Sequence, residues 1–449
     1  MTLLNSNYYE GEPMKLVKLS LVAAMAAGTF SALDAKPLEE AIKDVDVSGA
    51  LRYRFDQVSW GKDNTTNKLS SGYGVSESNT PHKFRAFVTP SISVGDGFKI
   101  VGQIMYNNDA NGGWYRDKTD VASGKIISSS GLTNTKNPIV LKQAYLQYDL
   151  ADAGVSVLFG KQQLNTIWTA DFTGMAAKVL ITPTQGLTIA AFGVDSFEGN
   201  TGDPDAFSFA KVSTSTATDE AKKAIDAFLY NNNMYGAAVL ANFAGLDAQV
   251  WGAYWDRVAT LYAVNLKYTL GLGGGNDVGV KVTYLGNSMD SDLKNELGNG
   301  NLVDGRVFAK FAGLDAQVGG IFYGKKDKTT INTLEDTTGP DLYIGREMFY
   351  ANNTALVHSY GQSVFGYVGV GYTLPMDLRV GVQGVFGQNT TTGTTDDVKD
   401  TRMEGVFELG YKVNKNLSLE GWYSYLNSKI KDSDSQNKST VRLQALYKF

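Results

Sequence analysis

The final eleven residues, 439–449, constrain the fold most, because apolar and polar side chains alternate along them. A period of two requires a β-strand, since only a strand sends successive side chains to opposite faces. One face carries Val441, Leu443, Ala445, Tyr447 and Phe449, and the other carries Arg442, Gln444, Leu446 and Lys448. A soluble edge strand shows the same alternation. A strand of a transmembrane β-barrel also shows it, with lipid on the apolar face and water on the polar face. The rest of the sequence must therefore decide between a soluble sheet and a membrane barrel.

Composition favours paired strands over a helical or doubly wound fold. The 449 residues include 49 Gly, 24 Tyr and 21 Phe but only 9 Pro, which is typical of closely paired strands with aromatic ends. Beyond the N-terminus no apolar run reaches the ~18 residues of a membrane-spanning helix. Barrel strands escape this criterion because half of their residues are polar. The chain has no Cys, which excludes thiol chemistry and a disulfide framework.

The N-terminus has the layout of an export signal. Lys15 and Lys18 precede a short apolar run at 19–27, and small residues follow up to Ala35. A basic head, an apolar middle and a small-residue end are typical of a secretory signal peptide. We therefore expect an upstream extension at 1–13, a signal peptide at 14–35 and a single barrel at 36–449. Removal of 1–35 takes away two of 41 basic and three of 46 acidic residues, so a slightly acidic chain remains, which leans towards cations.

Alternating segments repeat along the whole chain, separated in turn by tight turns and long polar loops. We count about eighteen strands, an even number as expected for an outer-membrane barrel. The octapeptide FAGLDAQV occurs twice, at 243–250 and 311–318, as a repeated hairpin turn. Segment 217–230 has helical periodicity and is expected to form a short helix at the barrel mouth. The first strand, from Val45, should pair with the last, because hydrocarbon tolerates no unpaired edge.

Catalysis has little support in this sequence. The two histidines, His82 and His358, are far apart in the chain, and there is no nucleophile motif or metal-ligand spacing. The glycine-rich stretch 271–276 lacks the Lys-Ser/Thr of a phosphate loop and is read as a turn. We therefore predict that the protein is not an enzyme and needs no cofactor.

Basic residues share the polar face of three strands that barrel closure brings together. This basic wall is expected to face the lumen, where charges stay hydrated, whereas at mid-bilayer facing lipid each would cost roughly 2–4 kcal/mol. The alternative is a solvated face without a role in selectivity. Opposite an acidic constriction, the wall would create a transverse field in the pore. The basic wall comprises Arg52, Arg54, Lys83, Arg85, Arg442 and Lys448.

The segment at 160–175 is less hydrophilic than the other loops and contains Trp168. We expect it to fold into the barrel as a constriction loop, which would place Asp171 at the narrowest point. The remaining long loops are expected on the extracellular side.

Several stretches resemble the Campylobacter-type major outer-membrane porin family. They are MKLVKLSLVAA at 14–24, PLEEAIKDVDVSG at 37–49 with LRYR at 51–54, GKQQLN at 160–165 with IWT at 167–169, AAF at 190–192 with VDSF at 194–197, YLGNS at 284–288, and 439–449. The resemblance implies an eighteen-stranded barrel, a homotrimer and a cation-preferring general diffusion channel. It also implies an acidic cluster able to hold calcium, mapped onto Asp171, Asp205 and Glu347. Calcium takes about six to eight oxygens, so carbonyls or water would complete the shell. The alternative is that these are ordinary loop acids with no ion bound.

We therefore expect an outer-membrane porin of a Gram-negative bacterium that passes ions and small hydrophilic solutes without binding nucleic acid. Two other functions remain open. A channel specific for one solute would need a closed binding site or aromatic rails, and an adhesin or structural barrel would act through its long loops.

Overall fold

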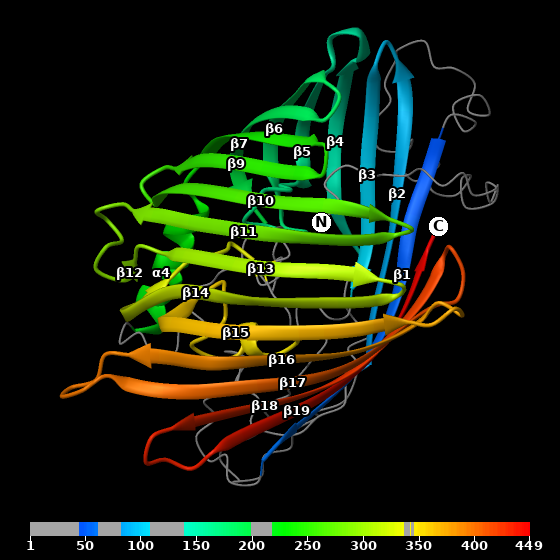
Figure 1. Ribbon diagram of the computed structural model, residues 1–449. Coiled ribbons are helices and arrows are strands. Elements are labelled where there is room, and N and C mark those ends of the chain that lie inside the picture. The colour runs from blue at the N-terminus through cyan, green and yellow to red at the C-terminus, as the bar shows by residue number, and fades with distance from the viewer. Residues whose placement is uncertain (1–44, 62–81, 108–138, 199–217, 336–341, 343–344) are drawn as a thin grey trace, which may run out of the picture.

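The alternating segments form long antiparallel strands that close into a barrel (Figure 1). The computed structural model describes residues 45–61, 82–107, 139–198, 218–335, 342 and 345–449. The predicted upstream extension and signal peptide lie outside these residues, as does Asp205. In the described part of the chain, eighteen long strands and one two-residue strand, β12, make up the sheet, which confirms the predicted fold class.

The strands are β1 (Val45–Trp60), β2 (His82–Gly95), β3 (Phe98–Asn107), β4 (Val140–Leu150), β5 (Val155–Gln163), β6 (Thr173–Thr184), β7 (Leu187–Phe197), β8 (Met234–Phe243), β9 (Leu246–Trp255), β10 (Ala259–Gly273), β11 (Asn276–Met289), β12 (Leu297–Gly298), β13 (Asn301–Phe311), β14 (Leu314–Thr330), β15 (Ser359–Thr373), β16 (Leu378–Thr391), β17 (Val398–Lys412), β18 (Leu417–Ile430) and β19 (Gln436–Lys448). The helical elements are η2 (Ala151–Ala153), α4 (Asp219–Tyr230) and η4 (Met348–Tyr350). Among the described residues, no helix has the length and apolar character needed to cross a membrane.

The barrel closes where the first strand meets the last. Strand β1 pairs with β19 in an antiparallel register that runs from Ala50 opposite Lys448 to Trp60 opposite Lys438. On its other edge β1 pairs with β2. Both edges of β1 are therefore hydrogen-bonded, which is what hydrocarbon requires of a spanning sheet.

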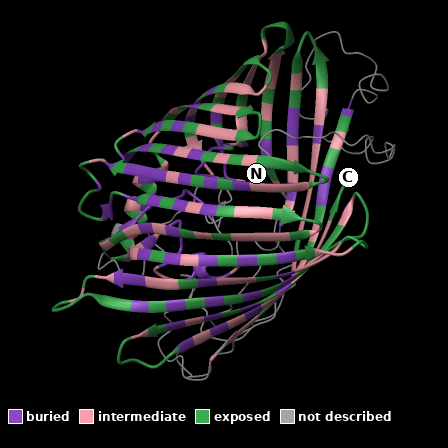
Figure 2. Cartoon of the chain, viewed as in Figure 1, coloured by how far each residue is buried: buried purple, intermediate pink, exposed green. Residues whose placement is uncertain are grey.

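The outer surface of the strands is apolar, and burial alternates along each strand (Figure 2). On β1, Leu51 and Tyr53 point outwards and are 41% and 45% exposed, whereas the neighbouring Ala50 is buried. On β19, Leu443 is 53% exposed. Exposed large apolar side chains on strand after strand form the surface that lipid covers in a membrane barrel.

Tight turns join the strands at one end of the barrel. The repeated octapeptide forms the same two-residue turn twice, with positive φ at Ala244 and Gly245 (45° and 86°) and at Ala312 and Gly313 (47° and 86°). Two successive positive φ angles define a type I′ turn, whose twist matches that of the flanking strands. The stretch 271–276 is likewise a turn, between β10 and β11, as its sequence predicts.

Segments at the opposite end of the barrel turn inwards. Of the predicted constriction loop at 160–175, residues 164–172 connect β5 to β6 and are mostly buried. The described residues between β14 and β15, which are 331–335, 342 and 345–358, are also mostly buried, although the long loops other than the constriction loop were expected on the extracellular side. The predicted helix is α4. Its Leu229 is buried and Ile225 and Phe228 pack against the apolar cluster, whereas Ala224 is exposed.

Candidate functional site

The basic wall lies on one inward face at the seam of the barrel. The register places Arg52 opposite Arg85, and Arg54 opposite Lys83, on the β1–β2 pair. Because β1 also pairs with β19, Arg442 and Lys448 lie on the same face. All six predicted basic residues are thus gathered on three adjacent strands.

A buried carboxylate, Asp56, forms ion pairs with this basic wall, which was not predicted from the sequence. Asp56 is 3% exposed and accepts hydrogen bonds from Nε and Nη2 of Arg442, at 2.6 and 3.0 Å. Lys83 Nζ lies 3.1 Å from the same carboxylate. Arg54 donates to the uncharged Oε1 of Gln444 at 2.8 and 3.0 Å. Alternation places Asp56 on the wall, but its pairing depends on the strand register.

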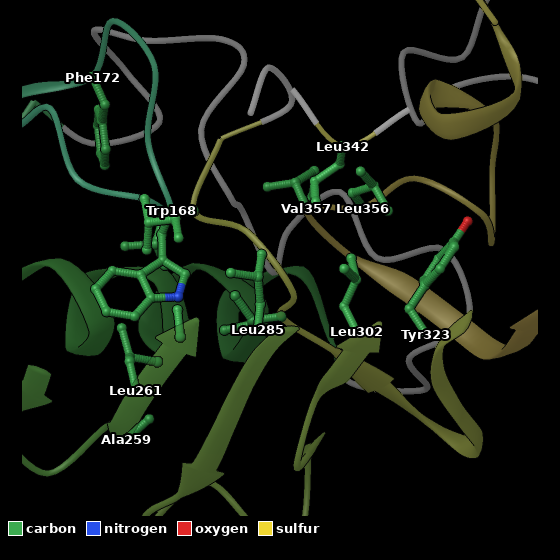
Figure 3. Packing of buried hydrophobic residues seen from close by; sticks show 14 of the residues in the cluster. Trp168, Phe172, Ala259, Leu261, Leu285, Leu302, Tyr323, Leu342, Leu356 and Val357 are labelled. Atoms are coloured by element: carbon green, nitrogen blue, oxygen red, sulfur yellow. The ribbon is translucent and has the colours of Figure 1, made fainter. Parts of the chain in front are cut away.

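The constriction loop is held by an apolar cluster inside the barrel (Figure 3). Trp168 is 2% exposed, and its ring lies 6.1 Å from that of Trp251 on β9. Leu261 of β10 and Leu285 of β11 belong to the same cluster. These strands therefore present apolar side chains on their inner face as well as towards lipid, and the loop covers the inner face.

Asp171 lies at the end of this loop and contacts the basic wall. Its carboxylate accepts a hydrogen bond from Nη1 of Arg85 at 3.0 Å. Burial alone would raise the pKa of Asp171, but the charges of Arg85 and Lys142 and the hydrogen bond from Arg85 lower it to about 2. The side chain therefore carries a negative charge in the lumen at neutral pH.

Glu335, which the sequence did not single out, fixes the loop in place. This fully buried carboxylate accepts backbone N–H groups of Ala170, Asp171 and Phe172 at 2.5 to 3.3 Å. The backbone N–H of Leu334 in turn donates to the carbonyl of Trp168 at 2.9 Å. The two infolded segments therefore bind each other through hydrogen bonds as well as apolar contacts.

A second carboxylate fixes residues 346–348 to the barrel wall. Glu404 of β17 accepts the backbone N–H groups of Arg346, Glu347 and Met348 at 2.8 to 2.9 Å. The hydroxyl of Ser424 also donates to it, at 2.7 Å. Hydrogen bonds from three successive backbone amides to one carboxylate are charge-assisted and strong. The segment is therefore anchored at a defined point.

The predicted acidic cluster is not assembled by the described residues. Glu347 forms an ion pair with Lys438 of β19, whereas Asp171 pairs with Arg85 of β2. In the ranges that the structure describes, no three His, Asp or Glu side chains lie close enough to hold a metal ion. With Asp205 outside those ranges, calcium binding stays a prediction.

Acidic and basic side chains of β14, β16, β17 and β18 form ion pairs with one another and with the infolded Arg346. Arg379 bridges Asp315, at 2.7 Å, and Glu408. Arg346 contacts Glu408 at 3.0 Å and Glu420 at 2.9 Å. These residues, except Asp315, line a cavity of about 500 Å³. Its walls carry both signs of charge.

A second row of basic residues, also missed from the sequence, lies on β10, β11 and β13. Lys281 is opposite Lys267 on one side and Arg306 on the other. Lys267 lies 5.4 Å from the ring centre of Phe308, and Arg306 donates to Gln317 at 3.1 Å. Positive charge is therefore distributed over two walls of the lumen.

A closed antiparallel barrel with an apolar outer surface, a charged interior and infolded loops defines an outer-membrane channel barrel. Solved structures of this class match the chain. Acinetobacter baumannii OccAB3 is 11% identical with a TM-score of 0.62, over 91% of this chain and 100% of that one. Pseudomonas aeruginosa OccK9 (OpdG) is 14% identical with a TM-score of 0.62, over the same shares. Acinetobacter baumannii OccAB4 is 13% identical with a TM-score of 0.59, over 90% and 98%.

Identities this low establish the fold alone. The family is established by sequence: residues 14–449 match the model of the Campylobacter major outer membrane protein, and the chain belongs to that family. No sequence among curated proteins matched. The predicted family and the outer-membrane localisation are confirmed, and the protein is a porin-type channel barrel.

Proposed function

We propose that the protein is a general diffusion porin, through which ions and small hydrophilic solutes pass without a catalytic step. The observation that carries this proposal is the charged interior beside the infolded loops. Cavities of about 500 and 270 Å³ lie against the charged strands. Hydrated ions and polar solutes need such a wet, polar path, and charged walls set which of them pass most readily.

We further propose a mild preference for cations. The full chain carries a net charge of −5. Asp171 forms a contact ion pair with Arg85 of the basic wall, so these two charges largely cancel at a distance. The proposed preference therefore rests on the net negative charge, which raises the local cation concentration.

Calcium does not fit the described residues by themselves. Asp171 and Glu347 already contact cationic partners, Arg85 and Lys438, and a bound Ca²⁺ would have to compete with both. The calcium prediction therefore depends on Asp205 and on oxygens from carbonyls or water. A chelator should leave conductance unchanged if no calcium is held.

We propose a homotrimer as the working assembly, on the strength of the resemblance noted from the sequence. Each barrel already encloses its own lumen, so trimerisation would buttress the barrels and leave three separate channels. Crosslinking of the protein in lipid vesicles should give a ladder that ends at three subunits. A ladder that ends at one would contradict the trimer.

Planar-bilayer recording tests the function directly. We expect ohmic single-channel conductance in KCl and a reversal potential of cation-selective sign in a salt gradient, measured with and without chelator. A barrel that inserts but does not conduct would contradict the porin assignment and favour a structural or adhesive role.

A further inference from the structure

Two lysines lie on the outer face of the barrel at its loop end, where β17 begins and β18 ends. Lys399 of β17 belongs to the same exposed face as Met403 and Phe407, which are 56% and 45% exposed. Lys429 of β18 belongs to the same exposed face as Tyr425. Both lysines therefore point away from the lumen, beyond the last apolar residues. The tight turn of this hairpin is at the other end, so the lysines lie on the extracellular side.

The strand register brings the two lysines close together. Lys429 is directly opposite Thr401, and Lys399 lies two residues from Thr401 on the same face of β17. Diagonal neighbours of this kind are roughly 7–8 Å apart, so both ammonium groups can reach one phosphate placed between them. Lysine binds phosphate as a point charge and needs no fixed geometry to do so.

Neither lysine is neutralised by an acidic side chain in the part of the chain that the structure describes. Two acidic residues close to Lys399 in sequence have other partners. Asp397 contacts Lys326 at 2.6 Å, and the buried Asp400 contacts Arg402 at 2.8 Å. The two outward lysines therefore offer positive charge to a partner outside the chain.

A recess of two glycines lies below the lysines on the lipid-facing surface. Gly405 of β17 is directly opposite Gly384 of β16. A Cβ added at Gly405 would meet nothing within 4 Å, and one added at Gly384 would meet only the side chain of Val368, at 3.8 Å. The neighbouring Phe386 is 59% exposed, so a large apolar side chain borders the recess. An apolar recess below two cations fits an acyl chain below a phosphate head group.

We propose that the outer face of β16 to β18 binds a phosphorylated glycolipid of the outer leaflet. Lys399 and Lys429 contact a phosphate of the head group, and an acyl chain lies over Gly384 and Gly405. Lipids of this leaflet carry phosphate on a sugar head group, and lysines at a membrane surface attract anionic head groups. The proposal uses the outer-membrane location of the barrel and does not depend on conduction.

The test is lipid binding to the folded protein in detergent, followed by native mass spectrometry, with bis-phosphorylated lipid A as the probe. The double variant Lys399→Gln/Lys429→Gln should bind lipid A at least ~10-fold more weakly, the loss expected for two lysine–phosphate contacts. The matched control is Lys412→Gln/Lys415→Gln, which removes two exposed lysines from the other end of the same hairpin. It should change binding less than ~2-fold. Equal losses in the two double variants would overturn the site.

Gly405→Leu tests the acyl part of the site without a change in charge. Gly405 has no positive φ and open space at its Cβ position, so leucine fills the recess without backbone strain. The control is Gly252→Leu on β9, an exposed position where an added Cβ also meets nothing within 4 Å. Gly405→Leu should weaken lipid A binding, and Gly252→Leu should not. Equal binding by the two variants would overturn the placement of the acyl chain.

Three outcomes identify the occupant of this face. Lipid A without its phosphates should bind at least ~10-fold more weakly than the bis-phosphorylated form, and equal binding would overturn the phosphate contact. Free pyrophosphate should compete only weakly because it has no acyl chain, and displacement at equal concentration would overturn a lipid site. Loss of subunits with unchanged lipid binding in Lys399→Gln/Lys429→Gln would assign the face to a contact between copies of the chain and overturn the proposal. Lipid A binding to a barrel that does not conduct would contradict only the porin assignment.

Discussion

Two sides of the same lumen are built differently. On the packed side, formed by the inner faces of β7 to β15 near the loop end, side chains such as Trp251, Leu261 and Phe365 belong to an apolar cluster with the infolded segments. On the charged side, formed by β16 to β19, β1 and β2, ion pairs such as those of Arg346 and Arg442 line the interior. A barrel interior can therefore serve as a protein core and as a water path at once, according to what covers each strand.

The largest expected effect is the loss of the packed side. Trp168→Ala empties a large buried site and should lower the free energy of unfolding by about 3–5 kcal/mol. It should also raise conductance, because the constriction loop loses its main apolar contact. Denaturant unfolding in lipid vesicles, followed by gel mobility, measures the first effect.

The control for Trp168 is a tryptophan on the charged side. Trp422 is 4% exposed and lies 5.0 Å from the guanidinium of Arg442. Trp422→Ala should alter ion selectivity more than Trp168→Ala does and cost less stability. The same loss of stability at both positions would show that the two sides do not differ in the way described.

Removal of an anchor should come next in size. Glu404→Ala leaves three backbone N–H groups without their acceptor, at a cost of about 3 kcal/mol, and should release segment 345–348 from β17 with a rise in conductance. Glu408→Gln, on the same strand, removes a charge that contacts the Arg346 side chain at 3.0 Å but leaves the three backbone amides of the segment bonded to Glu404, so conductance should change less. Indistinguishable conductance in the two variants would argue against the anchor.

Asp171→Asn tests the boundary between the two sides. Loss of this charge beside Arg85 should reduce the cation-to-anion permeability ratio roughly two- to five-fold. A change of that size corresponds to the interaction energy of a partly exposed ion pair. Reversal potentials in a KCl gradient measure it, and Asp434→Asn, in an exposed hairpin, is the control. An unchanged ratio in Asp171→Asn would remove this residue from the selectivity mechanism.

The lowered pKa of Asp171 sets a pH window. Because its folded pKa is about 2, below the ordinary value of 3.8, the carboxylate favours the folded state fully above about pH 4. That contribution is lost as the pH falls towards 2. The Asp171-dependent part of cation selectivity should therefore be constant from pH 7 to 4 and fall only below that. A midpoint near pH 6 would contradict the pairing with Arg85.

The smallest effect concerns the turn end, which both sides share. Ala244 and Ala312 adopt positive φ, which Asn tolerates better than Ala. Ala244→Asn and Ala312→Asn should each stabilise the barrel by about 0.5–1 kcal/mol, with equal shifts in the denaturant midpoint. A large difference between the two would mean that the two copies of the repeated turn do not contribute equally to stability.

The charged side could be predicted from sequence, whereas on the packed side only the constriction loop with Trp168 could. Alternation on 439–449 and on β1 places Arg52 and Arg442 inside the barrel, and closure brings them together. The segment between β14 and β15 has no such period, and the burial of its described residues depends on a surface supplied by distant strands. One signal was present: Phe192 and Trp251 make the inner faces of β7 and β9 apolar although their outer faces are apolar too. Glu335 and Glu404 acquire their roles only from backbone amides that the tertiary fold brings to them.

The central claim, that lipid covers one face of each strand and water the other, has a direct test because the chain contains no cysteine. Leu443 points outwards and the adjacent Gln444 lines the cavity of about 270 Å³. In single-cysteine variants reconstituted in vesicles, a charged, water-soluble thiol reagent should modify Gln444→Cys and reduce conductance. Leu443→Cys should stay unmodified. Rapid modification of Leu443→Cys with Gln444→Cys protected would contradict the account.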